Sequence, residues 1–145
     1  QYYKMLNKEG QLGQPIAIKG ETAEMVSAYP NGKTAMSLNL VKGSFDGKMT
    51  ISAENGNPEY ESTYDNGLLS GTRAEYFSNG KAYKKEQFVH GNYSGRQEYF
   101  SEDGLIRLSA EYKNDELHGN TILYNKGVVA TTKKYDSDQL VDIIK

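Results

Sequence analysis

The sequence predicts an all-β protein, built as an elongated, single-layer antiparallel meander of tandem β-hairpin repeats of about 24 residues. Three observations lead to this prediction. Glycines recur every 24 residues, aromatic and apolar residues recur in the same phase, and two turn signals separate strand-length segments within each unit. A helical periodicity is absent along the chain, apart from one alternative at residues 138–144.

Glycine columns define the period. One column contains Gly47, Gly71, Gly95 and Gly119, and another contains Gly32, Gly56, Gly80 and Gly104, continued by Gly127 after a one-residue deletion. A third column contains Gly43, Gly67 and Gly91, continued by Asp115 and Asp138. We predict structural roles for Gly47, Gly71, Gly80, Gly95, Gly104 and Gly119, because glycine supplies positive φ at turns and permits close backbone packing.

Aromatic and apolar columns keep the same phase as the glycines. They comprise Leu40, Tyr64, Phe88, Tyr112 and Tyr135; Phe45, Leu69, Tyr93, Leu117 and Leu140; and Tyr76, Phe100 and Tyr124, with Ser52 in the same column. Chance spacing of glycines would not bring these columns with it, so the repeat is a property of the fold.

Each unit contains two turn signals and two strand-like segments. Asn-Gly or Asp-Gly dipeptides mark one turn, as at Asn55-Gly56, and a second turn follows about 10 residues later, as at Asn66-Gly67. The segments between them, such as residues 72–77 and 83–88, are rich in residues that favour strands. Each unit is therefore expected to form a hairpin, with identical positions stacked on every second strand.

We expect one repeat domain over residues 1–145, with residues 29–135 as regular repeats between two atypical ends. Residues 1–28 would form a degenerate hairpin from Tyr2, Tyr3, Ile16 and Ile18, and residues 136–145 a cap from Leu140, Val141, Ile143 and Ile144. Terminal units differ from internal ones because they have an open sheet edge to cover.

Composition excludes several classes of protein. The 17 Lys and Arg are balanced by 19 Asp and Glu, and the pI is about 5.7, so nucleic acid is not an expected partner. Cysteine is absent, which excludes disulfides, thiolate metal sites and cysteine nucleophiles. No apolar run approaches the ~20 residues of a membrane-spanning helix. The chain has 12 Tyr and 15 Gly, which suits thin layers better than a thick core.

Motifs for catalysis or metal binding are weak. His90 and His118 lie at different phases of the repeat, so we interpret both as turn-flanking residues. The carboxylate pairs Glu59/Glu61 and Glu98/Glu111 could serve as acid and base, but a sheet wet on both faces would not raise their pKa values. We therefore predict that the protein is not an enzyme and holds no metal or cofactor.

The candidate binding residues are Tyr76, Phe100 and Tyr124, which would stack about 10 Å apart, two strand spacings, on one sheet face. Such a column would offer amphipathic rings to a protein, a sugar or a lipid. The alternative is that the rings only form the apolar layer of a thin sheet. A second expected surface is a basic patch of Lys81, Lys84, Lys85 and Arg96, which is the basis for a weaker interpretation of membrane association.

The columns resemble bacterial MORN-type repeats. The resemblance rests on residues 64–71, 88–95 and 112–119, in which an aromatic residue precedes a turn and an apolar residue stands two before a glycine. Residues 75–80 and 98–104 resemble the variant form of the repeat, and His118-Gly119 matches a step common in it. The match covers about residues 29–140 and implies an elongated single-layer antiparallel sheet. Members of the variant family are often labelled as antitoxin components.

The resemblance implies a protein-interaction or scaffolding module, antitoxin-like or part of a bacterial envelope assembly, whose partner is another protein. The alternative is an envelope protein that binds carbohydrate or lipid through the aromatic residues. Because the sequence starts at Gln1, we expect an exported protein that has lost a signal peptide and resides in the periplasm or at the cell surface. A cytoplasmic location is the alternative.

Overall fold

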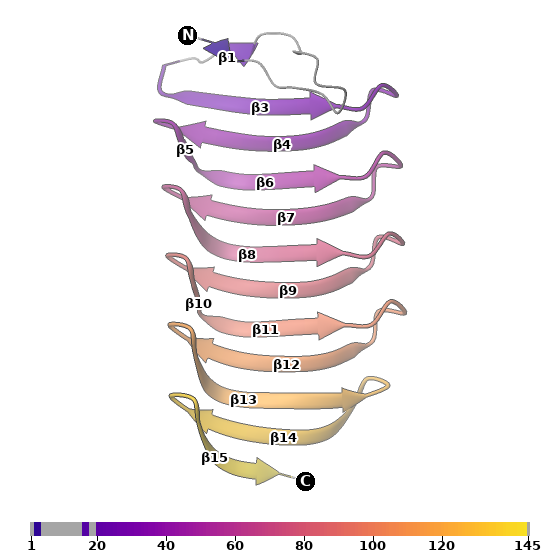
Figure 1. Ribbon diagram of the computed structural model, residues 1–145, viewed down its shortest axis with the longest axis vertical. Coiled ribbons are helices and arrows are strands. Elements are labelled where there is room, and N and C mark those ends of the chain that lie inside the picture. Colours follow the sequence, from indigo (N-terminus) through magenta and orange to yellow (C-terminus); the bar gives the residue numbers. More distant parts are fainter. Residues whose placement is uncertain (1, 4–15, 18–19, 145) are drawn as a thin grey trace.

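The computed structural model describes residues 2–3, 16–17 and 20–144, and these residues form strands and turns without any helix (Figure 1). A 13-stranded antiparallel sheet contains the described chain from residue 22 onward. Its strands follow one another in space as they do in sequence, from β3 at one end to β15 at the other (Figure 1). The predicted all-β antiparallel meander is therefore confirmed.

The strands of this sheet are β3 (Thr22–Ala28), β4 (Thr34–Val41), β5 (Ser44–Phe45), β6 (Gly47–Ser52), β7 (Pro58–Asp65), β8 (Leu68–Tyr76), β9 (Ala82–Val89), β10 (Asn92–Tyr93), β11 (Gly95–Phe100), β12 (Ile106–Lys113), β13 (Glu116–Asn125), β14 (Val128–Asp136) and β15 (Gln139–Ile144). The short strands β5 and β10 extend the pairing of β4 and β9 beyond a turn. Figure 1 shows the strands running across the long axis of the molecule, with turns along both sides.

One series of turns is built around the Asn-Gly and Asp-Gly dipeptides. In the first, the N–H of Gly32 donates to the carbonyl of Tyr29 at 2.9 Å, and the N–H of Tyr29 donates to Lys33 at 2.8 Å. Gly32 has φ of 82°, and Asn31 Oδ1 accepts from the N–H of Lys33 at 3.0 Å. The asparagine thus closes the loop, while glycine takes the left-handed conformation.

The turns on the other side have two residues, both with positive φ, as at Asn66 (49°) and Gly67 (85°). This is the geometry of type I′ hairpins. Asp115 and Asp138 replace glycine here and adopt φ of 69° and 65°. Their Oδ1 atoms accept at 2.7 Å from the N–H groups of Tyr93 and Leu117, so each aspartate ties its turn to the preceding unit.

The one-residue deletion before Gly127 has a local cause. Lys126 and Gly127 form a two-residue turn with φ of 49° and 79°, and Asn125 pairs directly with Val128. This turn replaces the longer loop found at Gly104 in the previous unit. A shorter turn type therefore absorbs the deletion, and the strands that follow keep their order.

A different role belongs to the glycine column of Gly47, Gly71, Gly95 and Gly119. Each has positive φ and faces the side chain of the residue eight positions before it, which lies on the neighbouring strand. A Cβ added at Gly95 would lie 3.5 Å from Gln87 Cβ, and one at Gly119 would collide with the carboxylate of Glu111. These glycines combine a left-handed backbone with close packing.

The two ends of the array differ from the middle. At the N-terminal end, β1 (Tyr2–Tyr3) pairs with β2 (Ile16–Ala17) in a separate two-stranded sheet, and Ile18 lies outside the described residues. At the C-terminal end, the helical alternative for residues 138–144 is wrong. Residues 139–144 pair with β14 as a strand, because the turn at Asp138 returns the chain antiparallel. Their apolar side chains stay about half exposed, for example Ile144 at 53%.

Small-angle scattering tests this shape. Eleven successive strands at ~4.8 Å give an object about 50 Å long. A compact chain of this length has a radius of gyration of roughly 15 Å, which corresponds to a sphere about 39 Å across. We expect the pair-distance distribution to show an elongated, flat particle. A globular distribution would contradict the single-layer meander.

Candidate functional site

The sheet has two faces with different chemistry. Side chains alternate along a strand, so the strand pairs place Tyr76, Phe100 and Tyr124 on one face, which we call the ladder face. Arg73 and Glu86 are paired across β8 and β9 and lie on the other face, which we call the network face. The predicted aromatic residues are thus brought to one surface.

A second column alternates with the rings on the ladder face. Glu61, Lys85 and Ser109 lie 24 residues apart on the strands between or beside the rings. The hydroxyl of Tyr76 donates to Glu61 Oε2 at 2.7 Å, and that of Tyr124 lies 3.4 Å from Ser109 Oγ. The tips of both tyrosines are therefore held by the neighbouring strand.

Tyr76 and Glu61 affect each other's ionisation. Burial, together with the hydrogen bond to the Glu61 carboxylate, raises the pKa of Tyr76 to about 12. Hydrogen bonds from Lys48 and Tyr76 lower the pKa of Glu61, and Lys48 Nζ lies 2.6 Å from Glu61 Oε1. At neutral pH the phenol is neutral and the carboxylate is ionised, so this corner of the face is polar but already paired.

Phe100 is the central ring and has no polar tip. It is half-buried, and the ammonium of Lys85 lies 5.9 Å from its ring centroid. Lys85 is exposed and forms no ion pair with any described residue, unlike Lys48 and Arg96, which pair with Glu61 and Glu98. The ladder face therefore offers one apolar ring beside one available cation.

A hollow of about 470 Å³ adjoins Tyr76 on this face. Buried Ala74 forms part of its lining, and its small side chain leaves space between the longer neighbours. The other lining residues are Lys48, Glu61, Ser62, Thr63, Thr72, Tyr76, Lys85 and Gln87. Most of these side chains are polar, so the hollow suits a hydrated or hydrogen-bonding group.

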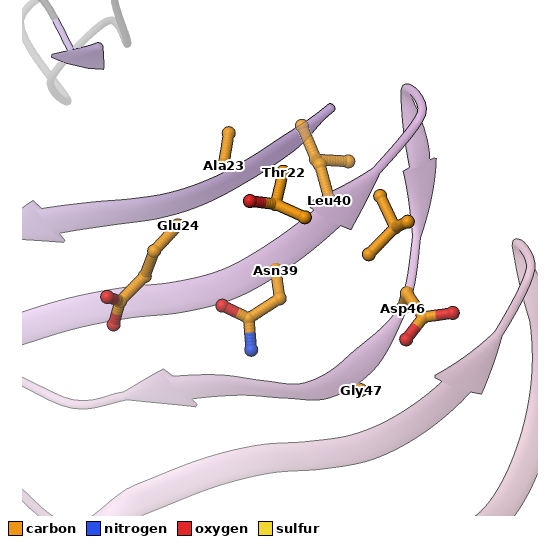
Figure 2. A pocket seen from close by; sticks show the side chains of 8 residues that line it. Thr22, Ala23, Glu24, Asn39, Leu40, Asp46 and Gly47 are labelled. Carbon is orange, nitrogen blue, oxygen red and sulfur yellow. The ribbon is translucent and has the colours of Figure 1, made fainter. Parts of the chain in front are cut away.

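A second hollow of about 540 Å³ lies on β3, β4 and β6. Figure 2 shows Glu24 and Asn39 extending to the same side of the sheet, in agreement with their pairing across β3 and β4. Asp46 stands at its edge, where its carboxylate accepts from the N–H of Asn66 at 3.3 Å. No aromatic residue lines this hollow.

The network face contains a buried carboxylate that the sequence did not predict. Glu86 is 1% exposed, and its Oε2 accepts from Arg73 Nε at 2.7 Å while its Oε1 accepts from the Tyr93 hydroxyl at 2.9 Å. Lys84 Nζ lies 3.6 Å from the same carboxylate. Burial alone would raise the pKa of Glu86, but the hydrogen bonds and charges of these neighbours outweigh it and lower the pKa.

Aromatic rings cover this network. The guanidinium of Arg73 lies 4.7 Å from the ring centroid of Phe88, which is 6% exposed and packs 4.8 Å from the ring of Tyr93. Burial and the nearby charge of Glu86 raise the pKa of Tyr99 to about 12. With its charges paired and its carboxylate pKa lowered, the network has the character of a structural core and offers no proton donor or base near neutral pH.

Two expectations about charged side chains are wrong. The sheet is not wet on both faces, because long side chains of the network face enclose Glu86. The four basic residues do not form one patch either. Lys84 pairs with Glu75 on the network face at 2.8 Å, and Lys81 Nζ donates to the carbonyl of Asp103 at a turn. Only Lys85 and Arg96 share the ladder face, which weakens the interpretation of membrane association.

Within residues 20–144, no group of three or more His, Asp or Glu side chains is placed to hold a metal ion, and no helix could cross a membrane. His118 lies at an exposed position with Nδ1 3.0 Å from Asp136 Oδ1. Comparisons with protein-family models and with curated proteins gave no match. The resemblance to MORN-type repeats therefore stays a prediction from the columns.

Proposed function

We propose that this protein is a non-enzymatic interaction module of the MORN-variant kind, which binds another protein through its ladder face. The observation that carries the proposal is the alignment of Tyr76, Phe100 and Tyr124 on one face, with the available cation of Lys85 between two of them. Interfaces concentrate their binding energy in a few aromatic and charged side chains of this kind. Antitoxin-like binding and assembly within an exported envelope complex are the two settings that the resemblance favours.

The repeat supports this proposal physically. Because each unit places one residue of a column beside the same residue of the next unit, one ring per unit makes a continuous surface without a deep pocket. A continuous surface of this kind suits a partner laid over the face better than an enclosed substrate.

Phe100→Ser tests the proposed surface. Serine already stands in this column at position 52, and loss of the central ring is expected to weaken capture of the native partner tenfold or more, about 1.4 kcal/mol. The matched control is Leu123→Ser, an apolar-to-serine change at an exposed position on the network face. Binding should be measured by capture from the native host, with melting temperatures of both variants recorded.

Three results would separate the alternatives. Weaker capture by folded Phe100→Ser with normal capture by Leu123→Ser supports the ladder face. An unfolded Phe100→Ser variant identifies the ring as core, and normal capture by a folded one places the partner elsewhere. A second candidate, binding of carbohydrate or lipid, is favoured by the polar hollow beside Tyr76, and it requires that an isolated sugar or vesicle bind without any protein partner.

A further inference from the structure

The spacing of the rings on the ladder face specifies the conformation of what binds there. Tyr76 lies in β8, Phe100 in β11 and Tyr124 in β13, so one strand separates each ring from the next. At ~4.8 Å per strand, the rings follow one another at about 9.6 Å along the long axis of the molecule. A partner that contacts all three must repeat at this distance on one side.

Only one regular backbone matches both the distance and the direction. A polyproline II helix has three residues per turn and a rise of 3.1 Å, so every third residue faces the same way at about 9.3 Å. In an extended strand, residues i and i+2 point to the same side and lie about 6.8 Å apart, which is too close for successive rings. Residue i+3 points to the opposite side. Two turns of α-helix span about 10.8 Å and drift by more than 1 Å at each ring.

Charge on the ladder face adds a second requirement. Lys85 lies on β9, between the strands of Tyr76 and Phe100, and forms no ion pair with any described residue, whereas Lys48 and Arg96 on the same face do. Lys85 would complement an acidic side chain placed between two ring contacts. Polyproline II carbonyls have no internal hydrogen bonds, so the same ammonium is a suitable donor to them as well.

We propose that the ladder face binds a proline-rich segment in the polyproline II conformation, laid across the strands with every third residue on Tyr76, Phe100 and Tyr124. An acidic residue between the first two contacts faces Lys85. The outer contacts are six residue rises apart, and their span of about 18.6 Å compares with about 19.2 Å between the outer rings. This inference rests on the proposed function, because it assigns a partner chemistry to the same face.

The test uses synthetic peptides and the wild-type chain, so it does not depend on a variant that folds. The probe is a nonapeptide of eight prolines and one aspartate at its third position. The controls are a glycine-serine nonapeptide with the same aspartate and an alanine-rich helical peptide of equal charge. Binding is followed by amide chemical shifts in a 15N-labelled sample.

We expect the proline peptide to bind at least tenfold more tightly than either control, with shifts clustered around residues 76, 100 and 124. Lys85→Gln keeps an N–H donor for the peptide carbonyls and removes only the charge, so it should lower affinity for the aspartate-containing peptide and leave that for a nonaproline peptide nearly unchanged. Lys113→Gln, an exposed lysine beside a turn, is the matched control and should change neither affinity.

Equal or absent binding of the proline and glycine-serine peptides overturns the inference. So do shifts that cluster on the network face or at the turns. If proline peptides fail while Phe100→Ser still weakens capture of the native partner, the polyproline inference is wrong and the proposed function stands. If capture is also insensitive to Phe100→Ser, both are wrong.

Discussion

Glu86→Ala is expected to lower the free energy of unfolding by about 3–5 kcal/mol, the usual cost of removing one partner of a buried ion pair. The carboxylate is 1% exposed and accepts hydrogen bonds from Arg73 and Tyr93. Its removal leaves the Arg73 guanidinium beneath the rings of the network face without its carboxylate partner. Urea unfolding of the variant and the wild type measures the difference, and a loss below about 1 kcal/mol would show that the network contributes little.

Acid titration and a double variant identify the cause of that loss. Because the pKa of Glu86 is lowered in the folded state, its ionisation stabilises the fold above the ordinary glutamate pKa, and this contribution disappears as pH falls through the folded value. The stability gap between wild type and Glu86→Gln should therefore shrink in acid. Arg73→Met combined with Glu86→Leu should recover most of the stability, since an apolar pair leaves no buried charge.

Gly119→Val is expected to cost about 3 kcal/mol, from backbone strain and a lost hydrogen bond together. Gly119 has φ of 115°, a region that valine does not adopt. An added Cβ would also collide with the carboxylate of Glu111, which accepts from the N–H of Asn120 at 2.6 Å. The measurement is the shift in denaturation midpoint.

Two other valine variants show how much of the loss of stability in Gly119→Val is specific to that position. Gly95→Val should destabilise by less, about 1–3 kcal/mol, because its φ of 96° is equally unsuitable but the nearest atom to an added Cβ is Gln87 Cβ at 3.5 Å. Arg107→Val, at an exposed strand position, should be close to neutral. Equal effects at all three positions would mean that the glycine column has no special backbone role. Lys84 is unsuitable as a control because it pairs with Glu75.

The fold was predictable because its signal repeats. A position such as Phe88 recurs as Tyr64 and Tyr112, so each unit gives independent evidence for the same hairpin. The shared face of Tyr76, Phe100 and Tyr124 followed from the same reasoning, since residues at the same position of the repeat lie on equivalent strands and point to the same side. The short apolar run at residues 139–144 has no later unit to compare with, and its length alone did not separate strand from helix.

The network around Glu86 was not predictable for the opposite reason. Positions 24 residues before and after Glu86 are Ser62 and Ala110, and the equivalents of Arg73 are Met49 and Gln97. The pair therefore occurs in one unit only, and a search for period cannot detect it. A comparison of paired positions would have shown Arg73 facing Glu86, but opposite charges also face each other at Glu75/Lys84 and Glu98/Lys85, so it would not have identified the buried pair.

Gln97 illustrates the same limit. Its side chain is 1% exposed, its Oε1 accepts from the N–H of Gln87 at 2.9 Å, and its Nε2 donates to the Gln87 carbonyl at 3.0 Å. It restores backbone hydrogen bonds where the glycine column interrupts the pairing of β9 with β11. A glutamine side chain either lies on the surface or hydrogen-bonds to the backbone of a neighbouring strand. Which of these occurs depends on where the strand pairing is interrupted, and composition does not reveal that.

The perpendicular arrangement of strands and long axis determines how this protein responds to tension. β3 and β15 lie at opposite ends of the sheet, and the hydrogen bonds between successive strands point along the line that joins them (Figure 1). A force applied between these two ends therefore loads the bonds in series and opens one strand pair at a time. The sheet would therefore unfold in steps, one strand pair after another. A proline-rich segment bound across its strands would resist their separation.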